Sequence, residues 1–178
     1  MRHHWRNARR PVRRRRSARP VNRTDVVLVG HSYGGMVISG VAGAAGSRIA
    51  YLVYLDAFLP EHGKALSDYA PVPPAREDGW RVPPPSTAEG FGVADPEGML
   101  WVQSRLGDQS PQTFIQPVVL TSVSRIPGTF IQCSEAPFFA GAAARARERS
   151  FRVHARLSAE HDAMITQPNA LAAILLEV

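Results

Sequence analysis

Four short stretches with the character of strands alternate along the chain with stretches of helical character. The first run, Val-Val-Leu-Val-Gly at 26–30, has no polar alternation, which predicts a strand buried on both faces, as in a parallel sheet. Small apolar residues over 33–46 predict a helix packed closely on that sheet. Further strands are predicted at 49–56, 128–133 and 151–157, and further helices at 137–149 and 168–177, the last with Pro168 in its first turn. Strands that alternate with helices indicate an α/β fold with a parallel sheet.

The segment 60–125 breaks this alternation. It holds most of the prolines and is too irregular for the core of a sheet, although a helix is predicted near 96–106. Its aromatic residues, Trp80, Phe91 and Trp101, argue against a disordered linker. We therefore predict a cap inserted between two parts of one core, residues 25–59 and 126–178.

The positive charge of the chain is concentrated at its beginning. The formal net charge is +6, but residues 1–24 contain ten arginines and no acidic residue, and the remainder has more Asp and Glu than Lys and Arg. Like charges at this density repel, which predicts a disordered tail. Nonspecific contact with nucleic-acid phosphates is a less favoured reading of the tail, and no specific nucleic-acid partner is expected.

The chain lacks the marks of secretion or membrane insertion. The tail has no apolar run of about 7–15 residues, as a signal peptide needs, and no stretch reaches the ~18 apolar residues of a membrane helix. Cys133 is the single cysteine, so an intramolecular disulfide and a multi-cysteine zinc site are excluded. A cytoplasmic setting fits these features, and the oligomeric state is left open.

A serine lies between the first predicted strand and the first predicted helix. Gly30-His31-Ser32-Tyr33-Gly34 matches Gly-x-Ser-x-Gly, and the strand–turn–helix context is the one that a nucleophile elbow needs. The turn is sharp enough that bulky residues at Gly30 and Gly34 would clash. Ser32 is the candidate nucleophile, the backbone N–H of Tyr33 the candidate oxyanion donor, and His31 a candidate pocket residue.

A serine near pH 7 needs a base, and His161 is the best candidate. It follows the last predicted strand, and the order Ser then His suits this elbow. The other histidines suit the role less well, because they lie in the tail, in the elbow itself, near the start of the cap or inside a strand (His3, His4, His31, His62, His154).

Three segments resemble the α/β-hydrolase superfamily: "VVLVGHSYGGMVISG", "YLVYLDAFLPEHG" and "AEHDAMITQPNALAAILLEV". The resemblance covers residues 25–178 and is strongest to small bacterial esterases related to plant methyl esterases and hydroxynitrile lyases. It implies a parallel sheet with a cap, and a serine hydrolase that acts on small carboxylic esters through an acyl-enzyme, without cofactor or metal. Hydroxynitrile lyases need a lysine after the catalytic histidine, and Asp162 stands there instead, which argues against a lyase.

The carboxylate of the implied triad departs from the family pattern. The plant relatives carry an aspartate after the strand that corresponds to 128–133, where this chain has Ala136. Asp56, at the end of the strand 49–56, is the preferred substitute, because haloalkane dehalogenases carry their acid at that strand end; Glu135 is the alternative. The cap aromatics Trp80, Phe91 and Trp101 either line an apolar acyl pocket or form a small core of the cap.

Relatives carry further strands and a His-Gly loop before the elbow, and that loop supplies a second oxyanion donor. Here only the arginine-rich tail precedes the elbow strand, so we expect an N-terminally truncated hydrolase. The strand would have an open apolar edge, which favours aggregation. Loss of one oxyanion donor lowers the rate by about 10²–10³. We therefore expect a poorly soluble, weakly active chain; the alternatives are an inactive remnant or, less favoured, a nucleic-acid binder.

Overall fold

The structure is a computed structural model that describes residues 22–87, 89–120, 126–133 and 137–178. The arginine-rich tail up to residue 21 and Glu135 lie outside these residues. The strands are β1 (Val26–Ser32), β2 (Ile49–Ala57), β3 (Gly128–Cys133) and β4 (Arg152–Leu157). The α-helices are α1 (Gly34–Ala45), α2 (Pro96–Gln103), α3 (Gln112–Ile115), α4 (Ala140–Glu148), α5 (Ala163–Thr166) and α6 (Pro168–Leu175). Short 3-10 turns occupy Gly46–Arg48, Leu66–Asp68, Glu89–Phe91 and Pro137–Phe139.

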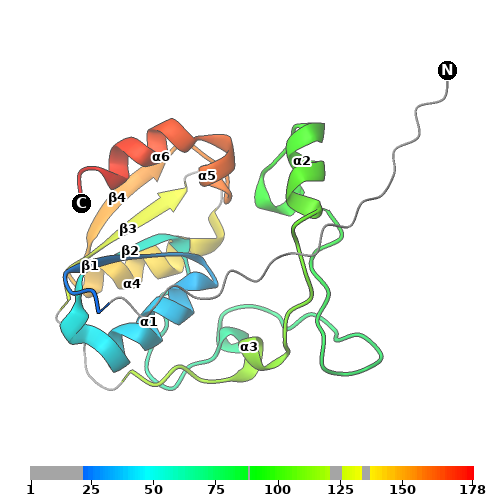
Figure 1. Ribbon diagram of the computed structural model, residues 1–178, viewed down its shortest axis with the longest axis horizontal. Coiled ribbons are helices and arrows are strands. Elements are labelled where there is room, and N and C mark those ends of the chain that lie inside the picture. Colours follow the sequence, from blue (N-terminus) through cyan, green and yellow to red (C-terminus); the bar gives the residue numbers. More distant parts are fainter. Residues whose placement is uncertain (1–21, 88, 121–125, 134–136) are drawn as a thin grey trace.

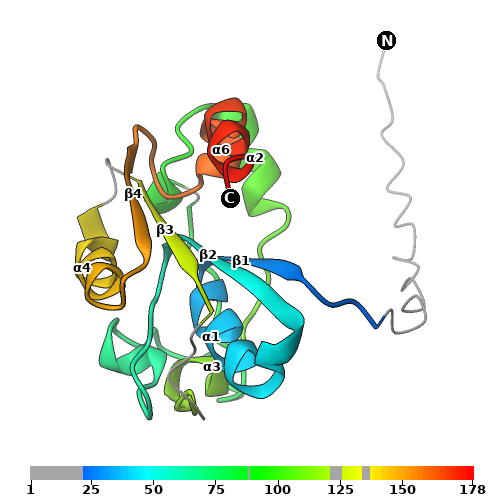
Figure 2. The same cartoon turned by 90° about the vertical axis from the view of Figure 1, so that its left-hand side faces the viewer.

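The four strands form one parallel sheet in the order β1-β2-β3-β4 (Figures 1 and 2). The α/β fold expected from the sequence is therefore confirmed. Because the strands are parallel, their carboxyl ends share one edge of the sheet. Ser32, Asp56 and Cys133 lie at these ends, and the loop after β4 begins at the same edge.

Helices cover both faces of the sheet. On one face, α1 and α4 contribute Met36 and Ala143 to a core with Phe130 of β3. On the other face, α6 packs Leu171 against a second core that includes Val53 and Ile131. The alanines of α4 allow this helix to lie close to the sheet, as the small residues of α1 do.

The expectation that residues 26–30 are buried on both faces is wrong. Val27 is 49% exposed and Val29 is 46% exposed, whereas Val26 and Leu28, which alternate with them, are partly buried. Within the described part of the chain, β1 is the edge strand and pairs with β2 alone. The apolar run therefore reflects one covered face, and the second face of β1 is open to solvent.

The segment between β2 and β3 contains α2 and α3. Its helix near 96–106 is confirmed as α2, whose first turn is capped by Asp95: an Asp95 side-chain oxygen accepts a hydrogen bond from the Gly98 N–H at 2.7 Å. Val93 and Val102 are buried in a small cluster that includes Phe91 and reaches Ile165 of α5. Figure 1 shows α2 beside α5, at the end of the sheet where the strands finish.

The two shortest helices, α3 and α5, were not expected from the sequence. Each has four residues, which is too few for an apolar period to show. None of the helices in the described ranges has both the length and the apolar character to cross a bilayer.

Candidate active site

Ser32 lies at a sharp turn between β1 and α1. Its backbone φ is +52°, a left-handed conformation that is uncommon outside glycine. A Cβ on Gly30 would lie 2.7 Å from the carbonyl oxygen of Gly34, so the turn requires glycine there. Across the sheet edge, the Phe58 N–H donates to the Ser32 carbonyl at 3.1 Å and fixes the elbow to the end of β2.

The second glycine that the turn requires is Gly35, not Gly34. A Cβ on Gly34 would meet nothing within 4 Å, whereas one on Gly35 would overlap the carbonyl oxygen of Phe58. The expectation for Gly34 is therefore wrong. The constraint comes from α1, which starts directly against the segment that follows β2.

Asp56 is fully buried at the carboxyl end of β2, and its φ is +38°. One oxygen of its carboxylate accepts a hydrogen bond from Nδ1–H of His161 at 2.8 Å. The other accepts from the Cys133 N–H at 3.2 Å. The structure thus brings Asp56 and His161 together across 105 positions of sequence.

His161 lies in the loop between β4 and α5, enclosed by rings. Phe139 stacks on it with centroids 5.2 Å apart and planes 14° apart, and Phe91 stacks at 6.2 Å. The His31 ring is 4.4 Å away and tilted by 37°. A carboxylate can only accept, so the bond to Asp56 fixes the proton on Nδ1 and leaves Nε2 of neutral His161 as a lone-pair acceptor.

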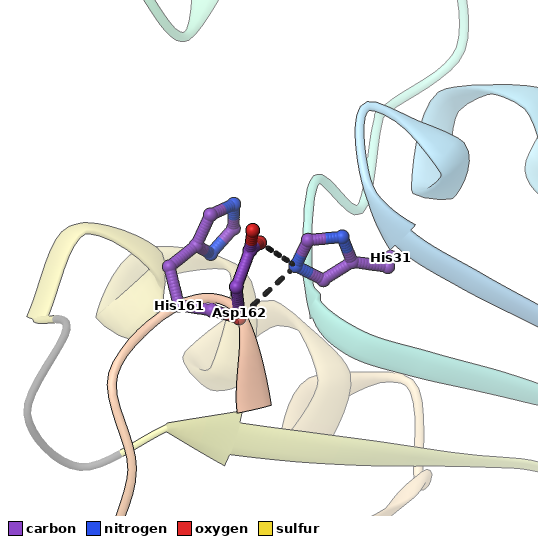
Figure 3. A group of neighbouring side chains, drawn as sticks. All are labelled: His31, His161 and Asp162. Atoms are coloured by element: carbon purple, nitrogen blue, oxygen red, sulfur yellow. Dashed lines mark hydrogen bonds and ion pairs between the residues drawn. The ribbon is translucent and has the colours of Figure 1, made fainter. Parts of the chain in front are cut away.

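His31 and Asp162 form a second contact at the same place (Figure 3). Nε2–H of His31 donates to the backbone carbonyl of His161 at 3.1 Å and lies 3.6 Å from the Asp162 carboxylate. Burial, followed by the charge of His161, lowers the pKa of His31, and the charge of Asp162 opposes this. Burial raises the pKa of the Asp162 carboxyl, and the two histidines oppose that shift.

Among the described residues, His31, His161 and Asp162 are the group whose ligand atoms come close enough to share a metal ion, all within 4.8 Å of one another. Each of the three already has a protein partner in the contacts described above. The expectation that no metal is needed stays a prediction.

Cys133 lies beside the carboxylate of Asp56 and is fully buried. Burial, with a contribution from the charge of Asp56, raises the pKa of its thiol to about 12. Because the thiolate is the nucleophilic form, this raised pKa argues against Cys133 as a nucleophile near neutral pH.

The cap aromatics divide into two groups. Phe91 lies by the site, and its carbonyl accepts from the Asp162 N–H at 3.0 Å. Trp80 is 64% exposed with the guanidinium of Arg81 over its ring, and Trp101 is 51% exposed beneath that of Arg105. The structure does not bring these two tryptophans to His161.

A separate cavity of about 490 Å³ lies between α1, the segment after β2 and the end of α4, and Ser32, Asp56 and His161 do not line it.

Sequence reasoning did not place Phe139 or Asp162 at the site. Phe139 falls within the helix predicted over 137–149, and Asp162 enters the sequence analysis only as the residue in place of a lysine. Both follow the carboxyl end of a strand closely, and that position is the signal that points to a site in a parallel sheet.

One curated relative is a carbendazim hydrolyzing esterase from Nocardioides sp. (strain SG-4G). It is 42% identical to this chain, and the match covers 54% of this chain and 46% of the relative. The matched part therefore spans less than half the length of that relative.

Solved structures with a similar fold include an extracellular α/β-hydrolase from a Paenibacillus species, with a TM-score of 0.70 and 21% identity over 87% of this chain and 72% of that chain. A pyrethroid hydrolase from Sphingobium faniae JZ-2 gives a TM-score of 0.65 and 23% identity, over 86% and 70% of the two chains. Polyneuridine aldehyde esterase gives 0.63 and 19%, over 90% and 73%. At these identities the likeness shows the fold.

The sequence model of the Alpha/beta hydrolase family matches residues 2–174, nearly the whole chain. The parallel sheet, the strand–turn–helix at Ser32 and this match lead to one conclusion: the chain belongs to the alpha/beta hydrolase family.

Proposed function

We propose that this protein is a serine hydrolase that cleaves carboxylic esters through an acyl-enzyme. Ser32 is the nucleophile, His161 the general base and then the general acid, and Asp56 the carboxylate that orients His161. The observation that carries the proposal is the 2.8 Å hydrogen bond from Nδ1–H of His161 to the buried Asp56. It leaves Nε2 as the basic nitrogen in a loop that lies beside the elbow.

In the proposed reaction, Ser32 Oγ attacks the ester carbonyl while Nε2 of His161 takes its proton. The backbone N–H of Tyr33, at the start of α1, donates to the oxyanion, and the partial positive charge of the helix end adds to this effect. His161 then gives the proton to the departing alcohol. Water, deprotonated by the same nitrogen, releases the acid from Ser32. These steps need no cofactor or metal.

The aromatic surroundings of the site favour esters with a flat apolar group. Phe138 is 59% exposed and packs edge-to-face on Phe58 and Phe139, and Phe139 stacks on His161. An exposed ring that is held by its neighbours offers an apolar contact at little entropic cost. The curated relative is named as a carbendazim hydrolyzing esterase, so carbendazim is the second substrate to test after simple aryl esters.

A fluorophosphonate probe tests the proposal directly, because it labels only an activated serine. We expect labelling of the wild-type chain and its loss in Ser32→Ala and His161→Ala. Ser47→Ala, which removes an exposed serine from the turn before β2, is the matched control and should label like the wild type. A folded, soluble wild-type chain that does not label would contradict the proposal and favour an inactive remnant.

A further inference from the structure

His31 connects the elbow to the loop that carries the proposed base. It is the residue immediately before Ser32 at the end of β1, and its partner, the carbonyl of His161, is 130 positions away. Figure 3 shows the two histidine side chains and Asp162 converging from β1 and from the loop before α5. Because a carbonyl only accepts, Nε2 of His31 carries the proton in this bond.

We propose that His31 is a positioning residue: its hydrogen bond to the backbone of His161 holds the base at a fixed distance from Ser32. The inference rests on the proposed function, since it assigns His31 a part in the same reaction. His31 acts on the main chain of the loop, whereas Asp56 acts on the ring of His161. The two bonds therefore restrain different parts of one residue.

Among the described residues, hydrogen bonds from three separate parts of the fold reach this loop. Asp56 at the end of β2 holds the His161 ring, and His31 at the end of β1 holds the His161 carbonyl. The Phe91 carbonyl, from the segment between β2 and β3, accepts from the Asp162 N–H. The Asp162 carbonyl, just before α5, in turn accepts from the Ile165 N–H within that helix at 2.8 Å. Of these three hydrogen bonds, the one from His31 is the bond that ties His161 to β1, the strand that ends at Ser32.

The contact does not need a charge on His31. Burial lowers the pKa of His31, so the ring is largely neutral near pH 7, and a neutral ring with its proton on Nε2 makes the bond to the His161 carbonyl. The Asp162 carboxylate, 3.6 Å from the same nitrogen, favours this proton placement. A neutral side chain with an N–H at the position of Nε2 should therefore make the same hydrogen bond to the His161 carbonyl in place of His31.

Glutamine and asparagine provide a matched pair for the test. The Gln amide nitrogen reaches the position of Nε2, whereas the Asn amide nitrogen reaches only that of Nδ1. With an aryl ester, we expect His31→Asn to lower kcat about 10- to 100-fold, as misplacement of a catalytic group does, with little change in KM. We expect His31→Gln to keep most of the wild-type kcat. Equal kcat values in the two variants would overturn the proposal.

Hydrogen exchange provides a readout that does not depend on turnover. In a Ser32→Ala background, His31→Asn should speed amide exchange in the loop around residues 158–163, while His31→Gln should not. A purely structural role for His31 would instead lower Tm and speed exchange throughout the sheet. Loop exchange that is unchanged in His31→Asn would overturn the proposal. If the wild-type chain had no esterase activity but the two His31 variants still differed in loop exchange as expected, the proposed function would be wrong. The positioning of the loop by His31 would then still be supported.

Discussion

At the scale of single residues, Ser32 and Asp56 share an uncommon backbone conformation. Both have positive φ, +52° and +38°, and they end neighbouring strands. Such a conformation costs a non-glycine residue of the order of 1–3 kcal/mol and persists where the surrounding structure enforces it. Here the bond from Phe58 N–H to the Ser32 carbonyl holds the backbone of Ser32, and the bond from Cys133 N–H to the Asp56 carboxylate holds the Asp56 side chain. Strain at both proposed catalytic positions fits a site whose side chains are held before substrate arrives.

The choice between Asp56 and Glu135 as the carboxylate can be tested by two matched changes. Asp56→Asn keeps the shape of the side chain but no longer holds the His161 proton on Nδ1, so we expect kcat to fall by about 10³–10⁴. Glu135→Gln should cause a much smaller loss. The measurement is the steady-state kcat of both variants with an aryl ester, together with Tm to confirm that both variants are folded. A larger loss of kcat in Glu135→Gln than in Asp56→Asn would mean that Glu135 is the carboxylate that orients His161.

At the scale of elements, the site depends on the close approach of α1 to the end of β2. Gly35 faces the Phe58 carbonyl, which lies one residue beyond the end of β2. The same segment bonds the Ser32 carbonyl, so the start of the helix and the elbow are fixed by one stretch of chain. The sequence pattern identified the strand, the turn and the helix, but not which glycine meets the neighbouring backbone. Gly34 and Gly35 are adjacent, and only the direction of α1 in three dimensions distinguishes them.

Alanine at each of these two glycines tests the approach. Gly35→Ala should destabilise the chain by about 1–3 kcal/mol or more, because the added methyl group overlaps backbone that cannot move freely. Gly34→Ala adds the same methyl group into open space and should leave Tm unchanged or slightly raised. Thermal unfolding followed by circular dichroism measures both. Equal effects on Tm would mean that α1 does not meet the segment after β2 in this way.

At the scale of the whole molecule, the order of the helices and strands could be predicted from the sequence, but which of their faces are covered could not. The sequence pattern located the four strands of the described residues, and Pro168 marked the start of α6 correctly. The apolar run 26–30 suggested that β1 is buried on both faces. That expectation was wrong because the sequence of a strand does not show which elements cover its two faces. The site was predictable in part for a similar reason. Ser32 and Asp56 lie at the carboxyl ends of parallel strands and His161 follows such an end, whereas the His31 contact depends on the path of a loop.

The open face of β1 makes a prediction about the behaviour of the 178-residue chain. Within the described residues, β1 has a strand on one side only, and Val27 and Val29 expose about half of their surface. An apolar strand of this kind pairs with other chains, and a lysine on it opposes such pairing. We expect the wild-type chain to self-associate as its concentration rises, and Val27→Lys to reduce this.

Val37→Lys is the matched control, because Val37 on α1 is also 49% exposed but lies on a helix, where it offers no free strand edge. Light scattering over a range of concentrations should show a clear drop in mean mass for Val27→Lys and little change for Val37→Lys. Both are surface changes, so Tm should move by no more than the equivalent of about 0.5 kcal/mol. If Val37→Lys reduced association as much as Val27→Lys, added charge and not the strand edge would be the cause. A wild-type chain that remained monomeric throughout would mean that the exposed valines of β1 do not attract a partner.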